Sequence, residues 1–240
     1  MLKFIETKSS VLSENTFADK FSNKRVLVIG SGPSVNMVNW KNVDVDVIVT
    51  TTFFYLNDNI RNLTNITHIT LSEIIDFTDE RLHDFLKINP DCTIALEPKA
   101  GRPFYNSQTF KIFEERYRDR LVYYNTIIDK KEGAGGRLAF FVMSFGPSEL
   151  YYVGIDGRAP IITKEHYNVF RPHIIGDPDN YDYQEFLDSH TIMADALYQY
   201  SLQYGCKLYN LGEGLDFNCS TSYSSKHYPL TTDIKTKLKV

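Results

Sequence analysis

Seven short apolar runs recur along the chain, and most of them are nearly continuous rather than alternating with polar residues. They are rich in Val, Ile and Tyr, which is typical of strands that are buried on both faces of a parallel sheet. The predicted strands span residues 25–29, 45–50, 66–71, 92–96, 120–124, 149–155 and 206–211.

Stretches with helical spacing of apolar residues lie between these strands. The predicted helices span residues 72–88, 107–117, 136–145 and 183–204, and Gly205 is placed to end the last one. Strands that alternate with helices predict an α/β fold with a single doubly wound, mostly parallel sheet, Rossmann-like in the broad sense. Because no repeat or linker interrupts the pattern, we expect one domain over residues 1–240, with a polar, aromatic lid at about 157–182.

Composition and charge narrow the classes of function. A net charge of −4 without a basic stripe argues against a nucleic-acid partner. The apolar runs are far shorter than the ~20 residues that cross a bilayer, and the N-terminus has no signal-peptide pattern. Cys92, Cys206 and Cys219 lack metal-binding or disulfide-framework spacing and are expected to be reduced thiols. We therefore expect a cytoplasmic protein without a transmembrane segment. The C-terminal KTKLKV is weakly basic, so peripheral contact with the inner face of the membrane stays open. The sequence also leaves homo-oligomerisation open.

The first predicted strand runs directly into the turn Gly30-Ser31-Gly32-Pro33-Ser34. Ligands of open parallel sheets bind at the carboxyl ends of strands, where the strand order reverses. Glycines let a phosphate or ribose approach the backbone, and a helix that begins at Pro33 would offer unpaired N–H groups. The alternative is a plain tight turn. The dinucleotide fingerprint G-x-G-x-x-G fails because Val35 stands at its third glycine, and no ATPase P-loop occurs.

Two later segments contain residues that could also contact a phosphate, ribose or base. The cluster Gly133-Ala134-Gly135-Gly136 precedes the predicted helix near Arg137, so it predicts a second helix N-terminus that can face phosphate. Another predicted strand ends at Gly154, and Asp156 and Arg158 follow it. Asp156 could cap a turn or orient a ribose or base, and Arg158 is suited to neutralise a phosphate leaving group. The second strand ends in TTTFFYL, whose hydroxyls and aromatic rings suit a base-and-ribose pocket.

Three segments, VLVIGSGPS, TTFFYLND and GGRLAFFVMSFGPSELYYVGID, resemble in order and spacing the bacterial sialyltransferases of glycosyltransferase family 42 and related transferases. The resemblance covers roughly residues 25–215. It implies a GT-A-variant fold, a CMP-activated nonulosonic acid donor (sialic acid, Kdo or a similar sugar) and a glycan acceptor. It also implies inverting transfer, a histidine base, and no required metal or other cofactor.

Nucleotide contacts carry over from the family residue by residue. The first turn matches the nucleotide loop, with Ser31 in place of the usual asparagine, and Gly154 matches the glycine next to the cytidine. Thr52 stands where the family has a nucleotide-contacting asparagine. Ala134 and Gly133 stand where a serine and a threonine would meet the donor, so those side-chain contacts are absent. With the residues inferred from the turns themselves, the predicted nucleotide-binding set is Gly30, Ser31, Gly32, Ser34, Thr52, Gly133, Ala134, Gly135, Gly154 and Asp156.

The resemblance also suggests the catalytic groups. His190, with Asp195 five residues later, best fills the position of the family's histidine base, and His173 is the rival. The paired tyrosines that hold the leaving phosphate are absent from their positions, where Arg158 and Lys164 stand instead. The predicted catalytic residues are therefore His190 and Arg158.

Other chemistry-bearing residues are expected to be structural. His68 lies in a predicted strand and His83 in a predicted helix. Asp44 and Asp46 form the D-x-D pattern of metal-dependent glycosyltransferases, but they begin a strand at the edge opposite the predicted site. Two other functions stay open: a Mg²⁺-dependent pterin pyrophosphokinase-like enzyme, which also has a Gly-Pro-Ser turn, and a non-catalytic nucleotide- or glycan-binding module.

Overall fold

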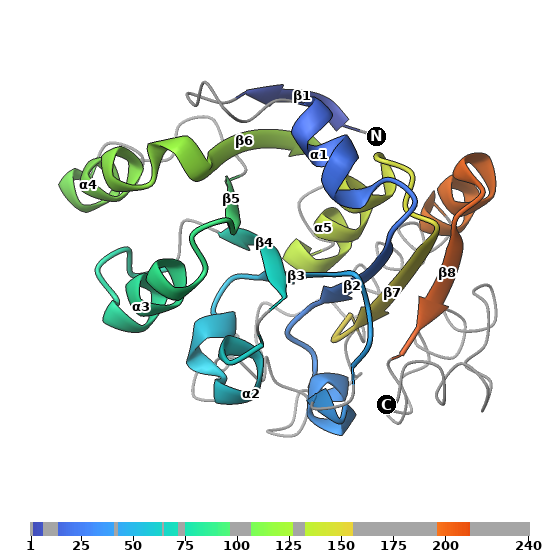
Figure 1. The fold of residues 1–240 in the computed structure, drawn as a ribbon, viewed down its shortest axis with the longest axis horizontal. Helices are drawn as coiled ribbons and strands as arrows, with labels where there is room; N and C mark the ends of the chain where they lie inside the picture. Colours follow the sequence, from blue (N-terminus) through green and yellow to red (C-terminus); the bar gives the residue numbers. More distant parts are fainter. Residues whose placement is uncertain are drawn as a thin grey trace, which may run out of the picture.

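A single eight-stranded sheet organises the chain in the computed structural model, which describes residues 2–6, 14–40, 43–63, 65–71, 75–96, 107–126, 133–155 and 196–211. The strand order is β1-β6-β5-β4-β3-β2-β7-β8 (Figure 1). Strands β2 to β8 are parallel, and β1 pairs with β6 in the antiparallel sense. The strands are β1 (Leu2–Glu6), β2 (Arg25–Ile29), β3 (Val47–Thr51), β4 (Ile66–Leu71), β5 (Thr93–Leu96), β6 (Leu121–Thr126), β7 (Glu149–Val153) and β8 (Lys207–Asn210). The predicted mostly parallel sheet is confirmed, and all seven predicted strands form.

Helices connect the strands. The α-helices are α1 (Glu14–Phe21), α2 (Asp58–Arg61), α3 (Glu80–Ile88), α4 (Gln108–Arg116) and α5 (Gly133–Met143). Residues 196–204 are also helical, and Gly205 ends this helix as predicted with a left-handed backbone (φ +65°). None of the helices within the described ranges is long and apolar enough to cross a membrane.

Within the segment 72–88, where the sequence predicts a helix start at Thr78 to Arg81, α3 begins at Glu80. The Asp76 carboxylate accepts hydrogen bonds from the backbone N–H and the hydroxyl of Thr78, at 2.8 and 2.6 Å, which favours a turn there. The carboxylate of Asp79 then caps α3 by accepting from the backbone N–H of Arg81 at 2.9 Å.

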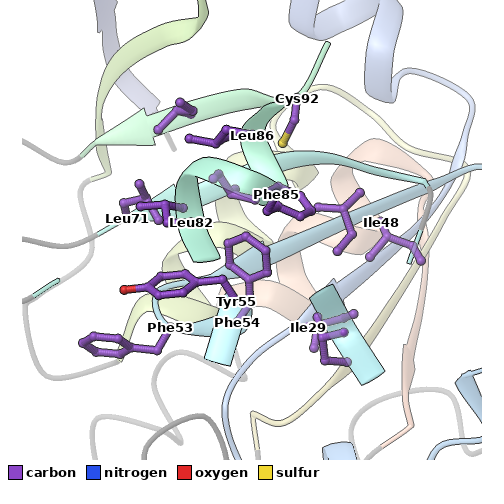
Figure 2. Close-up of a cluster of buried hydrophobic side chains, with 14 of the residues drawn as sticks. Ile29, Ile48, Phe53, Phe54, Tyr55, Leu71, Leu82, Phe85, Leu86 and Cys92 are labelled. Carbon is purple, nitrogen blue, oxygen red and sulfur yellow. The ribbon is translucent and has the colours of Figure 1, made fainter. Parts of the chain in front are cut away.

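Helices cover both faces of the sheet, as a doubly wound fold requires (Figure 1). Alternate residues of β2 face opposite sides. On one side Leu27 and Ile29 belong to a buried cluster with residues of α3 and α4, part of which Figure 2 shows. On the other side Val26 and Val28 belong to a second cluster with residues of α1 and α5. The core therefore consists of two apolar layers that the sheet separates.

The order in which the strands are added to the sheet reverses beside β2. Strands β2 to β6 follow one another across the sheet, and α5 then carries the chain back to β7 on the other side of β2. The carboxyl ends of β2 and β7 are thus the topological switch point, where ligands of open α/β sheets bind.

Candidate functional site at the β2–β7 junction

The turn after β2 is tied to the end of β7 by three hydrogen bonds. The backbone N–H of Gly30 donates to the carbonyl of Val153, and that of Gly32 donates to the carbonyl of Gly154, both at 2.8 Å. The hydroxyl oxygen of Ser34 accepts from the backbone N–H of Gly154 at 2.9 Å. Two of the three glycine-containing stretches, Gly30–Ser34 and the end of β7 at Gly154, are therefore joined directly.

The backbones at this place are too close for side chains. A Cβ on Gly30 would lie 2.3 Å from the carbonyl oxygen of Gly154. Gly154 has a left-handed backbone (φ +70°), and a Cβ on it would lie 2.6 Å from Cγ2 of Val35. Only glycine fits at either position.

The remaining glycine-containing stretch, Gly133–Gly136 in α5, reaches the same place. A Cβ on Gly135 would lie 3.1 Å from Cγ1 of Ile155 and 3.4 Å from Cα of Gly30. We call this meeting point, formed by Gly30–Ser34, Gly133–Gly136 and Gly154–Ile155, the β2–β7 junction. The structure thus brings the three predicted glycine-containing turns together.

The two helix N-termini differ from the sequence prediction. The segment after the first turn is a five-residue 3₁₀ helix, η1 (Pro33–Met37), and the N–H of Val35 in it donates back to the carbonyl of Gly32 at 3.2 Å. The second glycine cluster does not precede its helix, because α5 begins at Gly133 and contains the cluster in its first turn. The α-helical N-terminus at the junction is therefore that of α5, whose first N–H groups have no carbonyl within the helix.

Two predicted nucleotide-binding hydroxyls are held by the protein itself. Ser34 is 1% exposed, and its hydroxyl oxygen already accepts from Gly154. Thr52, just beyond β3, is 7% exposed and donates to the carbonyl of Thr70 at 3.4 Å. Ser31 and Ala134 are half-buried at the junction.

The aromatic residues after β3 do not form the wall of an open base pocket, contrary to the sequence interpretation. Phe53, Phe54 and Tyr55 are all buried. The ring of Phe54 lies edge-on to that of Phe85 of α3, with centroids 4.6 Å apart, inside the cluster shown in Figure 2. Phe53 adopts a left-handed backbone (φ +70°), which is rare for a large side chain and turns the following residues into the core.

One buried cation that follows the glycine cluster in sequence was missed as a functional candidate. Arg137 follows the glycine cluster in α5 and is 8% exposed. Sequence analysis used this residue only to mark the start of a helix. The available signal was a single charged residue within GAGGRLAFFVM, a helix whose other residues are apolar or glycine.

Several predicted site residues lie outside the described residues. These are the catalytic candidates His190 and Arg158, the predicted ribose or base contact Asp156, and the lid at about 157–182. The rival base His173 and the cation Lys164 also lie there, so these assignments stay predictions.

The residues predicted to be structural have structural contacts. Asp44 and Asp46 lie at the amino ends of β2 and β3, where Asp46 pairs with the guanidinium of Arg25 at 3.2 Å. Hydrogen bonds from the backbone and side chain of Arg25 lower the pKa of the Asp46 carboxyl. His83 bonds to the hydroxyl of Tyr117 at 2.6 Å through Nδ1. Within the described ranges, no group of His, Cys, Asp and Glu is arranged to hold a metal ion.

His68 and two of the cysteines are buried. The imidazole of His68 is stacked on Phe141, with centroids 4.9 Å apart, and burial lowers its pKa well below the usual value. Cys92 and Cys206 are free thiols, as predicted, and burial raises the pKa of each to about 12. Thiols with so high a pKa are poor nucleophiles, which supports a packing role.

Comparison with known proteins gives a likeness at the level of fold. No protein-family model matches the sequence, and no curated protein does. Among solved structures, a variant of the sialyltransferase Cst-II in complex with CMP has a TM-score of 0.51 and 15% identity, covering 90% of this chain and 98% of that one. CstII from Campylobacter jejuni in complex with the substrate analogue CMP-3FNeuAc has a TM-score of 0.49 and 16% sequence identity, and the match covers 88% of each chain. An α-2,3-sialyltransferase from Campylobacter jejuni in its apo form has a TM-score of 0.49 and 14% sequence identity, and the match covers 95% of this chain and 86% of that one. The chain is therefore similar in fold to the Cst-II sialyltransferase over most of both chains.

Proposed function

We propose that this chain is a glycosyltransferase that moves a sialic acid-like sugar from a CMP-activated donor to a hydroxyl group of a glycan. The observation that carries the proposal is the meeting of Gly30, Gly135 and Gly154 at the point where the strand order reverses. The likeness in fold to a sialyltransferase in complex with CMP supports the same class of donor.

The β2–β7 junction has the chemistry that a nucleotide phosphate needs. Glycine backbones without side chains let an anionic group approach closely. The first turn of α5 supplies N–H groups and the positive end of a helix dipole. Arg137, one turn into the same helix and 8% exposed, is the charged residue nearest to these glycines along α5.

The proposed transfer is a single displacement without a metal ion. The acceptor hydroxyl attacks the anomeric carbon of the donor, a new C–O bond forms, and the bond to the CMP oxygen breaks with inversion. His190 takes the proton from the hydroxyl, and CMP leaves with its phosphate charge stabilised by Arg158 and neighbouring cationic or tyrosine side chains. These two roles come from the sequence resemblance.

A thermal-shift panel tests the donor class directly. The protein is heated with CMP, CMP-sialic acid, CMP-Kdo, or ATP with Mg²⁺. A ligand at about 100 times its Kd adds about 2.7 kcal/mol to stability, which is roughly 5 to 10 °C in Tm for a chain of this size. We expect this shift with CMP and at least one CMP-sugar.

Transfer to a glycan acceptor is then measured with whichever CMP-sugar binds. A shift with ATP and Mg²⁺ but none with CMP would contradict the proposal and favour the pyrophosphokinase-like alternative. Binding of CMP-sugars without transfer to any acceptor would contradict the proposed activity and favour a non-catalytic binding module.

A further inference from the structure

Two adjoining pockets lie on the face of the sheet that α2 and α3 cover. One, of about 400 Å³, is lined by residues of α2 and α3, and the other, of about 530 Å³, reaches from α2 to Trp40. They share Asn62 and Leu63, and we call them together the α2 groove. None of the residues that line it belongs to the β2–β7 junction, and its size suits a small organic ligand.

Carboxamide side chains give the groove its polar chemistry. Asn59 and Asn62 are exposed, and their side-chain amides make no hydrogen bond to any residue in the described part of the chain. The amide nitrogen of Asn65 donates to the carbonyl of Val45 at 3.4 Å, while its amide oxygen keeps its capacity to accept. An amide both donates and accepts hydrogen bonds, as a hydroxyl group does, so these side chains match a ligand rich in hydroxyl groups.

Apolar surface lies beside the amides. The indole N–H of Trp40 donates to the carbonyl of Val35 at 3.2 Å, so the ring offers the pocket apolar surface rather than a donor. Leu63 lines both pockets, and Ile88, which is 77% exposed, lines the one against α3. Ile48 and Phe85 line one pocket each and continue into the buried cluster of Figure 2, so the floor is rigid. An aromatic ring with aliphatic neighbours suits the C–H faces of a sugar ring.

Both cations of the groove are paired with carboxylates. Its lining contains two arginines and two aspartates, Arg61, Arg81, Asp58 and Asp84. Arg61 is paired with Asp58, and Arg81 is paired with Asp79 at 2.7 Å. Cations that are already paired add little attraction for a phosphate or carboxylate, so a neutral ligand fits better than an anionic one.

We infer that the α2 groove is a second binding site that takes a neutral carbohydrate, with room across its two pockets for more than one sugar unit. Amides bind the hydroxyl groups and Trp40 packs against a ring face. The inference does not rest on the proposed glycosyltransferase activity, because the groove and the β2–β7 junction share no residue.

The chain carries its own reporter for this site, since Trp40 is its single tryptophan. The intact protein is titrated with lactose, maltotriose and cellotriose while tryptophan emission is recorded. We expect a saturable change with at least one sugar, with a Kd in the millimolar range or below. The double variant Asn59→Ala/Asn62→Ala removes two free amides and should weaken that binding roughly tenfold.

Gln108→Ala is the matched control, because it removes an exposed carboxamide from α4, away from the groove. It should bind the sugar as the unaltered protein does. All substituted side chains are exposed, so the variants should fold, which circular dichroism verifies. Absence of any saturable change up to about 20 mM sugar, or unchanged affinity in the double variant, overturns the inference. Failure of CMP to bind has no bearing on it.

Discussion

The hydroxyl of Ser34 accepts a hydrogen bond from the backbone N–H of Gly154 at 2.9 Å, although the two residues are 120 positions apart in the chain. The bond is buried, and it fixes the turn after β2 against the end of β7. A residue predicted to touch the nucleotide is thus a structural link between the two strand ends. Its effect on ligand binding is expected to act through the shape of the junction.

Replacing Ser34 by alanine leaves the N–H of Gly154 buried without its acceptor. We expect a loss of about 1–3 kcal/mol in the free energy of unfolding, together with weaker CMP binding. Urea denaturation and calorimetry with CMP measure the two effects. Ser201→Ala is the control, because Ser201 is also 1% exposed and its hydroxyl donates to the carbonyl of Tyr198 at 2.7 Å. CMP binding that is equally affected, or equally unaffected, in both variants would argue against a positioning role.

Gly154→Ala should be far more damaging than Gly146→Ala. Both glycines have left-handed backbones, with φ +70° and +65°, so both substitutions strain the main chain by about 1 kcal/mol. Only at Gly154 does the new methyl group also collide with neighbours, whereas a Cβ on Gly146 would meet nothing within 4 Å. We expect Gly154→Ala to cost at least about 3 kcal/mol in urea denaturation or to prevent folding. Equal losses in the two variants would show that the junction is looser than described.

We expect the free energy of unfolding to decrease as the pH is lowered below about 6.5, and His68 is the cause. Burial lowers the pKa of His68 in the folded protein, whereas the unfolded chain binds a proton near its usual pKa. The unfolded state therefore holds more protons as pH falls. The stabilisation is fully present above the unfolded pKa and is lost as pH falls below it, with a slope of up to about 1.4 kcal/mol per pH unit.

His68→Leu is the variant that tests this slope. Folding of the variant is followed by urea denaturation between about pH 5 and 7, above the range in which the carboxylates titrate. The slope attributed to His68 should disappear. If the variant keeps the same pH dependence as the unaltered protein, the imidazole is not the group responsible.

His190→Ala tests the base assigned by the resemblance. Transfer should fall by ~10²-fold or more while CMP binding stays intact, because the general base acts on the acceptor and not on the nucleotide. His173→Ala, assayed in parallel with the same CMP-sugar, is the comparison. A large loss of transfer activity in His173→Ala, with normal turnover in His190→Ala, would assign the general base to His173 instead of His190.

The sheet was predictable because strands buried on both faces leave continuous apolar runs in the sequence. Strand β1 was not predicted, since five residues at the sheet edge acquire their structure by pairing with β6, which is distant in the chain. The meeting of the glycine turns was also predictable, because the carboxyl ends of parallel strands share one edge of the sheet.

The orientation of individual side chains was not predictable from local pattern. Phe54 and Tyr55 turn into the core because Phe53 adopts a left-handed backbone, which no propensity of phenylalanine indicates. The link between Ser34 and Gly154 depends on two segments that tertiary structure alone brings together. The early start of α5 at Gly133 runs against the low helix propensity of glycine, which burial of the following apolar turns offsets.

The place of β7 beside β2 has a consequence for biosynthesis. As the chain leaves the ribosome, β2 to β6 can pair one after another with the strand just made, because each lies beside its predecessor. Strand β7 must then return past four completed strands to reach β2, a non-local pairing that forms slowly. A nascent chain released before Glu149 could hold most of its sheet and still lack the β2–β7 junction, so the proposed nucleotide site would form only after β7 is made.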